Sequence, residues 1–352
     1  MITVKIVGAG GYGGVGITEL LLGHPEAKVQ TLVAATETGM KMSDLYPHLA
    51  GFCDLPILKP DDPAAQEPAD VVFFSTPDGV GMVQARAELE KGARVIDYSG
   101  DFRFASTEDY AEYATRIGKD PLHKAPDLLE KTIYGVPEIQ REQINSNRQL
   151  VGNPGCFAVG VIIGLAPAAA NDLVEENSII CDCKSAVSGA GKKPAPGFHY
   201  PARYDNINAY RLTGHQHVVE VEQALSRVAG KKVAITFTTQ VVPACRGILS
   251  SLYGHLKDGV TYEQVLEAYR SYHAPNGFVR IYDRTANIGT ANVRGSNFCN
   301  LLVDVDERTR KLRVISHIDN LMKGQAGSAL QNMNLIMGLP ENLGLDRPGQ
   351  YP

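Results

Sequence analysis

Several features that would direct this chain to a membrane, to secretion or to nucleic acid are missing. No segment approaches the roughly 20 consecutive apolar residues that a membrane-spanning helix needs, and Met1 leads directly into a strand-like segment, which leaves no room for a signal peptide. The net charge of −5 lacks the positive balance that a nucleic-acid partner usually demands. We therefore expect a cytoplasmic protein with no nucleic-acid and no membrane partner.

Cysteine is scarce, and in a long chain without a secretory signal its even count is weak evidence for disulfides. The chain of 352 residues holds six cysteines. One residue separates Cys181 from Cys183, whereas a CxxC metal or redox motif has two residues between its cysteines. The segment that contains them alternates like a buried strand. No pair of cysteine or histidine residues has the spacing usual for zinc, so we predict no metal site.

The first part of the chain alternates strand-like and helix-like segments. Residues 70–75 form an almost continuous apolar run, as expected for a strand covered on both faces of a sheet. Strands alternating with helices predict an α/β, Rossmann-type doubly wound parallel sheet. In chain order we expect a strand at 2–7, a helix at 15–22, strands at 29–35 and 70–75, a helix at 81–91 and a strand at 94–98.

The pattern changes after residue 156, where longer strand-like runs lie closer together. They predict a second, α+β domain with a mixed or antiparallel sheet. The length suits two domains, which we place at 1–155 for dinucleotide binding and 156–324 for catalysis and oligomerisation, with 325–352 returning to the first. Segment 196–210 is expected to be a loop or lid. The other segments expected here are strands at 178–187, 232–243, 247–256, 300–305 and 311–318, and helices at 217–228, 261–272 and 325–337.

A glycine-rich loop opens the chain. Gly8, Gly10 and Gly13 have the G-x-G-x-x-G spacing and lie between a predicted strand and a predicted helix. In such a loop the first glycine permits a tight turn, the second lets the backbone approach a pyrophosphate, and the third allows close packing of helix on strand. The helix N-terminus then holds the phosphate charge. The loop predicts a dinucleotide site.

The end of the second strand leaves the choice between NAD and NADP open. Glu37 could bind a ribose 2′-hydroxyl, which favours NAD. Thr36, Thr38 and Lys41 could instead cradle a 2′-phosphate, and no arginine is present to decide between the two.

Cys156 is the most informative residue of the chain. It ends the run Gly152–Cys156 and precedes an apolar stretch, 157–170, that predicts a helix. A thiol at a helix N-terminus meets the positive end of the macrodipole and unpaired N–H groups, which favour the nucleophilic thiolate. A dinucleotide site together with such a thiol indicates hydride transfer to or from a thioester.

Two histidines are candidates for the acid–base group. His215 and His217 come just before the helix expected at 217–228, and we prefer His217 because a residue at a helix start is better fixed. Glu220 or Glu222 could orient the ring, although a solvated helix face is the role we expect of both.

The substrate of such chemistry is anionic, so cationic side chains and backbone N–H groups are of interest. Arg103 follows a predicted strand end, and the run Ser188–Gly191 could offer backbone N–H groups to an anion. Structural ion pairs and an ordinary glycine turn are the alternatives for these two features. The cationic candidates are Arg103, Lys192, Arg203 and Arg246.

Through eight short motifs taken together, the chain resembles the N-acetyl-gamma-glutamyl-phosphate reductase family, which is related to aspartate-semialdehyde dehydrogenase. They follow in the family's order over essentially the whole chain. The motifs are Gly8–Gly13, Asp101–Arg103, Tyr134–Glu138, Gly152–Cys156, Ser188–Gly191, Gly214–His217, Val293–Cys299 and Asp319–Gly324.

The resemblance implies the NADPH-dependent reduction of an acyl phosphate to an aldehyde, in a homotetramer or dimer. It implies Cys156 as nucleophile, His217 or His215 as acid–base group, and Asn320 beside the nicotinamide. For the substrate we assign Arg103, Asn153, Lys192 and Arg246. For the cofactor we assign Gly8, Gly10, Gly11, Tyr12, Gly13, Thr36, Ser75, Pro77, Ser188, Gly189 and Asn320.

The chain departs from the family's pattern at two positions. Val159 stands where the family usually has a threonine near the nucleophile, and Lys192 stands where it usually has arginine. Because lysine is a point charge rather than a planar fork, the anion contact differs. Three alternatives therefore stay open: the same chemistry on an aminoadipyl phosphate, the same chemistry on aspartyl phosphate, and a non-catalytic NADP-binding regulator.

Overall fold

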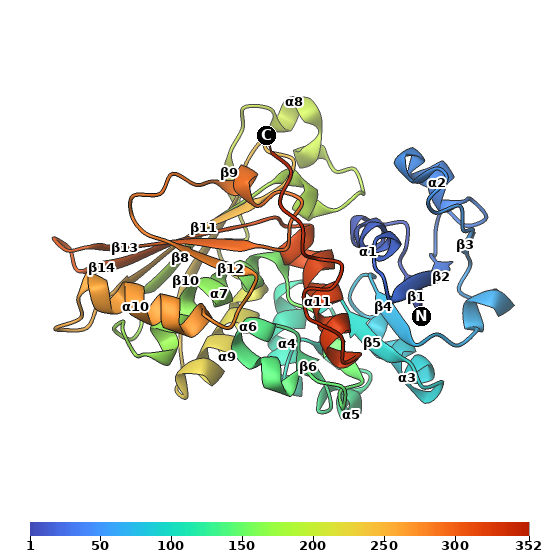
Figure 1. The fold of residues 1–352 in the computed structure, drawn as a ribbon, viewed down its shortest axis with the longest axis horizontal. Coiled ribbons are helices and arrows are strands. Elements are labelled where there is room, and N and C mark those ends of the chain that lie inside the picture. The colour runs from blue at the N-terminus through green and yellow to red at the C-terminus, as the bar shows by residue number, and fades with distance from the viewer. Residues whose placement is uncertain (352) are drawn as a thin grey trace. The chain divides into compact units, whose positions relative to one another are not determined.

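The computed structural model describes residues 1–351, which form two compact units (Figure 1). The first unit contains Met1–Ala111, Asp120–Pro154 and Gln325–Arg347. The second contains Glu112–Lys119, Gly155–Gly324 and the chain from Pro348 onward. The chain thus returns to the first unit after completing most of the second.

The first unit is built on a seven-stranded sheet in the order β3-β2-β1-β4-β5-β7-β6, and every neighbouring pair in it is parallel. Each of the four residues of β4 is buried, which explains its uninterrupted apolar sequence. The strands are β1 (Ile2–Val7), β2 (Ala27–Val33), β3 (Ile57–Leu58), β4 (Val71–Phe74), β5 (Arg94–Asp97), β6 (Ile133–Tyr134) and β7 (Leu150–Gly152).

Helices connect these strands and cover the sheet. Helix α11, from the C-terminal part of the chain, packs against α1 and β5. Helix α4 (Thr107–Arg116) crosses from the first unit into the second. The other helices of the unit are α1 (Tyr12–Leu22), α2 (Met42–Leu45), α3 (Gly81–Glu90), α5 (Pro126–Leu129), α6 (Pro137–Gln140) and α11 (Gly327–Ile336).

The second unit contains a mixed seven-stranded sheet in the order β12-β13-β14-β11-β8-β10-β9. Pairs β8–β10 and β12–β13 are parallel, and the other neighbours are antiparallel. The strands are β8 (Ile179–Ser185), β9 (Asn208–Tyr210), β10 (Ile235–Val241), β11 (Ile248–His255), β12 (Val279–Tyr282), β13 (Cys299–Asp306) and β14 (Lys311–Ile318). The helices are α7 (Cys156–Ala170), α8 (Tyr200–Arg203), α9 (His217–Ala229) and α10 (Tyr262–His273).

Helix α7 is the core of this unit. Residues 157–169 are buried, because the helix lies between the sheet strands β11 and β14 and the helices α9 and α10. Gly164 has no side chain where a Cβ would collide with Leu252 of β11, so the helix can approach the strand closely. A helix that is apolar all round is expected to be buried in this way, and its first residue is Cys156.

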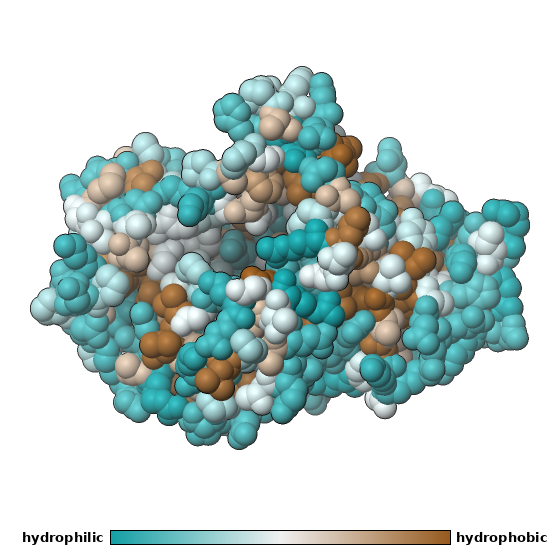
Figure 2. All heavy atoms as spheres, turned by 180° about the vertical axis from the view of Figure 1, so that it is seen from behind, coloured by the Kyte–Doolittle hydropathy of each residue, from teal (hydrophilic) through white to brown (hydrophobic). Residues whose placement is uncertain are grey.

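The predicted fold class, a parallel Rossmann-type sheet plus a second domain with a mixed sheet, is confirmed. The segment expected to be a loop or lid, 196–210, contains the short helix α8 and the edge strand β9. Among the described residues, no helix is long and apolar enough to cross a membrane. On the face drawn in Figure 2, hydrophobic residues are interspersed with hydrophilic ones.

Candidate active site

Cys156 is the first residue of α7, and Gly155 is the N-cap with an extended backbone. The backbone N–H of Gly155 donates to Glu220 Oε1 over 2.7 Å. A Cβ on Gly155 would collide with the ring of His217, so glycine is needed for this ring to lie against the start of the helix. The turn before the thiol therefore brings together Cys156, His217 and Glu220.

His217 is the histidine that meets the thiol. Its Nδ1 lies 2.7 Å from Glu220 Oε2, and its side chain also interacts with that of Cys156. Burial disfavours the imidazolium, but the Glu220 carboxylate and the Cys156 sulfur outweigh it and raise the pKa of His217 to about 8. A protonated ring places a positive charge beside the Cys156 side chain.

Glu220 is completely buried, so our expectation of a solvated helix face is wrong for this residue. Its two oxygens serve two different elements, one the N–H before α7 and the other the ring at the start of α9. The hydrogen-bonded ring lies one helical turn before Glu220 on α9, so the i, i+3 spacing was the only sequence signal for this contact.

His215 has a different environment. Its ring lies among the rings of Phe157, Tyr210 and Phe237, with centroid distances of 5.3–5.7 Å. Burial, followed by the charge of His217, lowers the pKa of His215 to about 2, so this ring is neutral. Its Nδ1 accepts the backbone N–H of His217 over 3.3 Å, which assigns the proton of the neutral ring to Nε2.

A cavity of about 420 Å³ opens beside these groups within the second unit. Arg211 supplies a positive charge to its wall, and the thiol and both histidines reach it. No sequence pattern indicated that Arg211 or Tyr210 is part of the site. The lining residues are Cys156, Phe157, Ser185, Ala186, Gly189, Ala190, Phe198, Tyr210, Arg211, His215, Gln216, His217 and Val241.

Two of the predicted cofactor residues of this unit lie together. Asn320 Nδ2 donates to Ser188 Oγ over 2.9 Å, and Asn320 Oδ1 accepts the N–H of Gly247 over 2.7 Å. Gly189 follows Ser188 and lines the cavity. The amide of Asn320, two residues after the end of β14, is thus held in one orientation.

The cationic side chains predicted to bind substrate differ in exposure and in the contacts they already make. Arg246 forms an ion pair with the buried Asp319 over 3.0 Å and retains partial exposure. Lys192 is exposed. Arg203 is buried and donates to the carbonyls of Gly197, Asn206 and Val241, which ties down segment 196–210.

In the first unit, Arg103 and Asn153 are buried. Arg103 donates to the carbonyl oxygens of Asn153 and Tyr98. Asn153 donates to the carbonyl of Gln325 and accepts from Asn332. These bonds give both residues a structural role, and their contact with substrate stays a prediction.

The glycine loop has the shape of a phosphate cradle. A Cβ on Gly8 (φ 89°) would collide with the carbonyl of Ser75, and one on Gly13 with its hydroxyl. Gly11 is the N-cap of α1 and has no side chain to occupy the N–H groups of the first turn, and Tyr12 is the first residue of that helix. Such a bare helix N-terminus suits a pyrophosphate, so the loop fits a dinucleotide. Ser75 and Pro77 follow the carboxyl end of β4, the edge where ligands bind such sheets.

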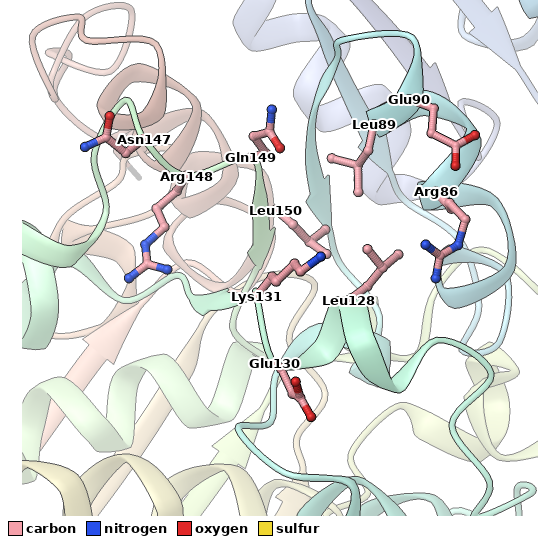
Figure 3. Close-up of a pocket in the computed structure, with 10 residues that line it drawn as sticks. All are labelled: Arg86, Leu89, Glu90, Leu128, Glu130, Lys131, Asn147, Arg148, Gln149 and Leu150. Carbon is pink, nitrogen blue, oxygen red and sulfur yellow. The ribbon is translucent and has the colours of Figure 1, made fainter.

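Another cavity, of about 530 Å³, lies in the first unit (Figure 3). It is at the amino ends of the parallel strands, opposite the edge where the glycine loop lies. Its wall includes Gln149 and Leu150, at the beginning of β7, and Leu89 near the end of α3. None of the predicted site residues lines it. Within residues 1–351 we also find no group of three or more side chains placed to hold a metal ion.

Two family models cover most of the chain. Residues 3–147 match the semialdehyde dehydrogenase NAD binding domain, and residues 156–320 match the semialdehyde dehydrogenase dimerisation domain. N-acetyl-gamma-glutamyl-phosphate reductase of Symbiobacterium thermophilum is 44% identical over 355 residues, which cover 100% of this chain and 99% of that protein. The Geotalea daltonii protein of the same name is 40% identical over 353 residues and 100% of both chains.

The chain belongs to the N-acetyl-gamma-glutamyl-phosphate reductase family. The resemblance inferred from the eight motifs is thereby confirmed, as is a nicotinamide-dinucleotide-binding domain of the semialdehyde dehydrogenase type.

Solved structures with the same fold are more distant in sequence. Aspartate semialdehyde dehydrogenase II of Vibrio cholerae has a TM-score of 0.71 at 16% identity, over 96% of this chain and 99% of that one. Aspartate semialdehyde dehydrogenase of Candida albicans, solved with NADP, has a TM-score of 0.72 at 15% identity, over 97% and 99%. At these identities the likeness shows the fold alone.

Proposed function

We propose that this chain reduces N-acetyl-gamma-glutamyl phosphate to N-acetylglutamate semialdehyde and phosphate, a step of arginine biosynthesis, through a thioester on Cys156. The observation that carries the proposal is the contact of Cys156 with His217, whose ring is held by the buried Glu220. Such a thiol–imidazole–carboxylate arrangement is a recurrent design for nucleophilic catalysis. The names of the relatives supply the substrate.

The Cys156 sulfur attacks the carbonyl carbon of the acyl phosphate. The C–S bond forms, the C–O bond to phosphate breaks, and phosphate leaves with one proton from solvent. Protonated His217 favours the attacking thiolate by its charge. Arg211 lines the same cavity as Cys156, the first residue of α7, so its charge and the helix N-terminus are proposed to stabilise the negative charge of the attacked acyl phosphate.

The nicotinamide, when bound, supplies the hydride that converts the thioester to a thiohemiacetal. His217 gives its proton to the oxygen that gains charge in this step. On collapse it takes this proton back, the C–S bond breaks, the aldehyde departs, and the thiolate is restored beside the imidazolium. Within the chain, Glu220 keeps the ring in the orientation that both transfers need.

The cofactor is proposed to be NADP(H), as the family resemblance implies, with the loop Gly8–Gly13 at its pyrophosphate and Asn320 at the nicotinamide. We also propose a homo-oligomer, because the second unit matches a dimerisation domain. A cytoplasmic location is proposed because all six cysteines are free thiols.

The test is a spectrophotometric assay in the reverse direction. The protein is offered N-acetylglutamate semialdehyde, phosphate and NADP⁺ or NAD⁺, with N-acetylaminoadipate semialdehyde and aspartate semialdehyde as competitors. Reduced cofactor should form with the first aldehyde, and Cys156→Ser should lower turnover by roughly 10³-fold or more while cofactor affinity stays within about twofold. Preference for either competitor would contradict the substrate, and equal activity of Cys156→Ser would contradict the covalent mechanism.

A further inference from the structure

One acidic side chain lies at the glycine loop. Glu37 follows β2 by four residues and has a φ of 55°, in the left-handed region that few non-glycine residues adopt. A Cβ on Gly10 would lie 2.9 Å from Glu37 Oε2, so the side chain is folded back over the second glycine of the loop. Unusual backbone conformations of this kind concentrate at ligand sites.

The surroundings of Glu37 hold its carboxylate at this place. Thr36 donates its hydroxyl hydrogen to Glu37 Oε2. Tyr46 donates to the carbonyl of Gly10 over 2.9 Å, and burial together with the charges of Tyr12 and Glu37 raises the pKa of Tyr46 to about 12. The carboxylate is therefore held beside Gly10, the second glycine of the loop.

The segment around Glu37 has too little positive charge to neutralise this carboxylate and attract an anionic group. Residues 34–46 contain two carboxylates, Glu37 and Asp44, and one cation, Lys41, whose exposed side chain lies in the same segment. No arginine is present between residues 34 and 46. Residues 34–46 thus have a formal net charge of −1 in the absence of cofactor, which disfavours the binding of a 2′-phosphate at this edge.

In a sheet of this kind, the adenosine ribose lies between the second glycine of the loop and the end of the second strand. A carboxylate there accepts a hydrogen bond from the ribose 2′-hydroxyl, whereas it repels the two negative charges of a 2′-phosphate at short range. NADP(H) can be accommodated only if the half-exposed Glu37 side chain turns away and leaves Thr36 and Lys41 to the phosphate.

We propose that Glu37 binds the ribose 2′-hydroxyl of the cofactor and sets its selectivity, so that this chain binds NAD(H) with an affinity comparable to that for NADP(H). The proposal rests on the dinucleotide site of the proposed function and refines its cofactor. It does not depend on the acyl substrate.

The test is calorimetric titration of the full chain with NAD⁺ and NADP⁺, without any acyl substrate. For the native chain we expect the two Kd values to lie within about tenfold of each other. Glu37→Gln keeps the size of the side chain but removes its charge, so it should tighten NADP⁺ binding by roughly tenfold and leave NAD⁺ binding unchanged or weaker.

Glu67→Gln is the matched control, because it removes the same charge from an exposed residue just ahead of β4, at the opposite edge of the parallel sheet. It should leave both Kd values unchanged. Native NADP⁺ binding more than about 100-fold tighter than NAD⁺ binding, or an equal effect of Glu37→Gln on both cofactors, would overturn the proposal. If the reverse assay shows no turnover while Glu37→Gln still shifts the Kd ratio, the proposed reaction fails and this inference stands.

Discussion

Two buried carboxylates, one in each unit, show how the same group is used in opposite ways. Glu220 in the second unit has a hydrogen-bond donor at each oxygen, and its charge raises the pKa of His217. Asp97 in the first unit accepts from the N–H and hydroxyl of Ser99 at Oδ1, whereas its buried Oδ2 has no hydrogen-bond partner among the described residues. Burial, helped by Asp101, raises the pKa of Asp97 to about 8.

The difference follows from what each carboxylate faces. A cation partner in a low-dielectric site stabilises the ionised form, whereas burial beside a second carboxylate favours the neutral acid. Gly81, where a Cβ would collide with Asp97 Oδ2 and lie 3.3 Å from Asp101 Oδ2, lets these two carboxylates share a small space. Glu220 therefore supports charge at the site, and Asp97 is a neutral structural acid near neutral pH.

The largest expected effect comes from removing the charge of Glu220. Glu220→Gln should lower kcat by roughly 10²-fold, because glutamine has one acceptor oxygen for the two donors that Glu220 serves and no charge to stabilise the imidazolium of His217. Since His217 is charged below its pKa, kcat/KM of the native chain should fall as pH rises through about 8, and in the variant this fall should occur at lower pH. Glu222→Gln, on the same helix but bonded to the N–H of Ile235, should change neither the rate nor the profile.

A smaller loss is expected from Gly155→Ala. The added Cβ would push the ring of His217 away from Cys156, and a displacement of this size costs about 10²-fold or less in kcat. Gly277→Ala, between α10 and β12, has no positive φ and no atom within 4 Å of its Cβ, so it tests the cost of a methyl group alone. Native kcat in Gly155→Ala would show that contact with this ring is not needed.

The smallest effect concerns stability. The native state holds a proton on Asp97 at pH values where the unfolded chain, with a pKa of 3.8, has lost it, so this residue makes the fold less stable as pH rises from about 4 to 8. Asp97→Asn keeps the neutral form and should raise Tm at pH 8 by roughly 2–4 °C, equivalent to about 1 kcal/mol. Thermal denaturation at pH 5 and pH 8 checks this, and a variant that is equally destabilised at both pH values would contradict it.

Local sequence patterns predicted much of the fold and part of the candidate active site. The positions of Cys156 and of the loop Gly8–Gly13 depend on a few adjacent residues, and long regular elements such as α7 and β14 agree with prediction within a few residues. The short strands β7 and β12 were not predicted, because three or four residues give too little periodicity and their pairing comes from distant segments.

The rest depends on contacts between segments far apart in the sequence. The burial of Glu220 is set by the N–H of Gly155, 65 residues away, and no pattern on α9 distinguishes it from a solvated residue. The left-handed backbone of Glu37 is equally invisible in sequence, since a glutamate is among the residues least expected there. The burial of Glu220 and the backbone conformation of Glu37 are therefore known only from the three-dimensional structure.

The most direct test of the account is an NMR titration of the histidine ring signals in the native chain and in Glu220→Gln, with His217→Asn used to assign the ring. We predict that His217 titrates near pH 8 in the native chain and at lower pH in Glu220→Gln, while His215 stays neutral throughout. A His217 ring that titrates at the same pH in both proteins would contradict the claim that a buried carboxylate sets the charge beside Cys156.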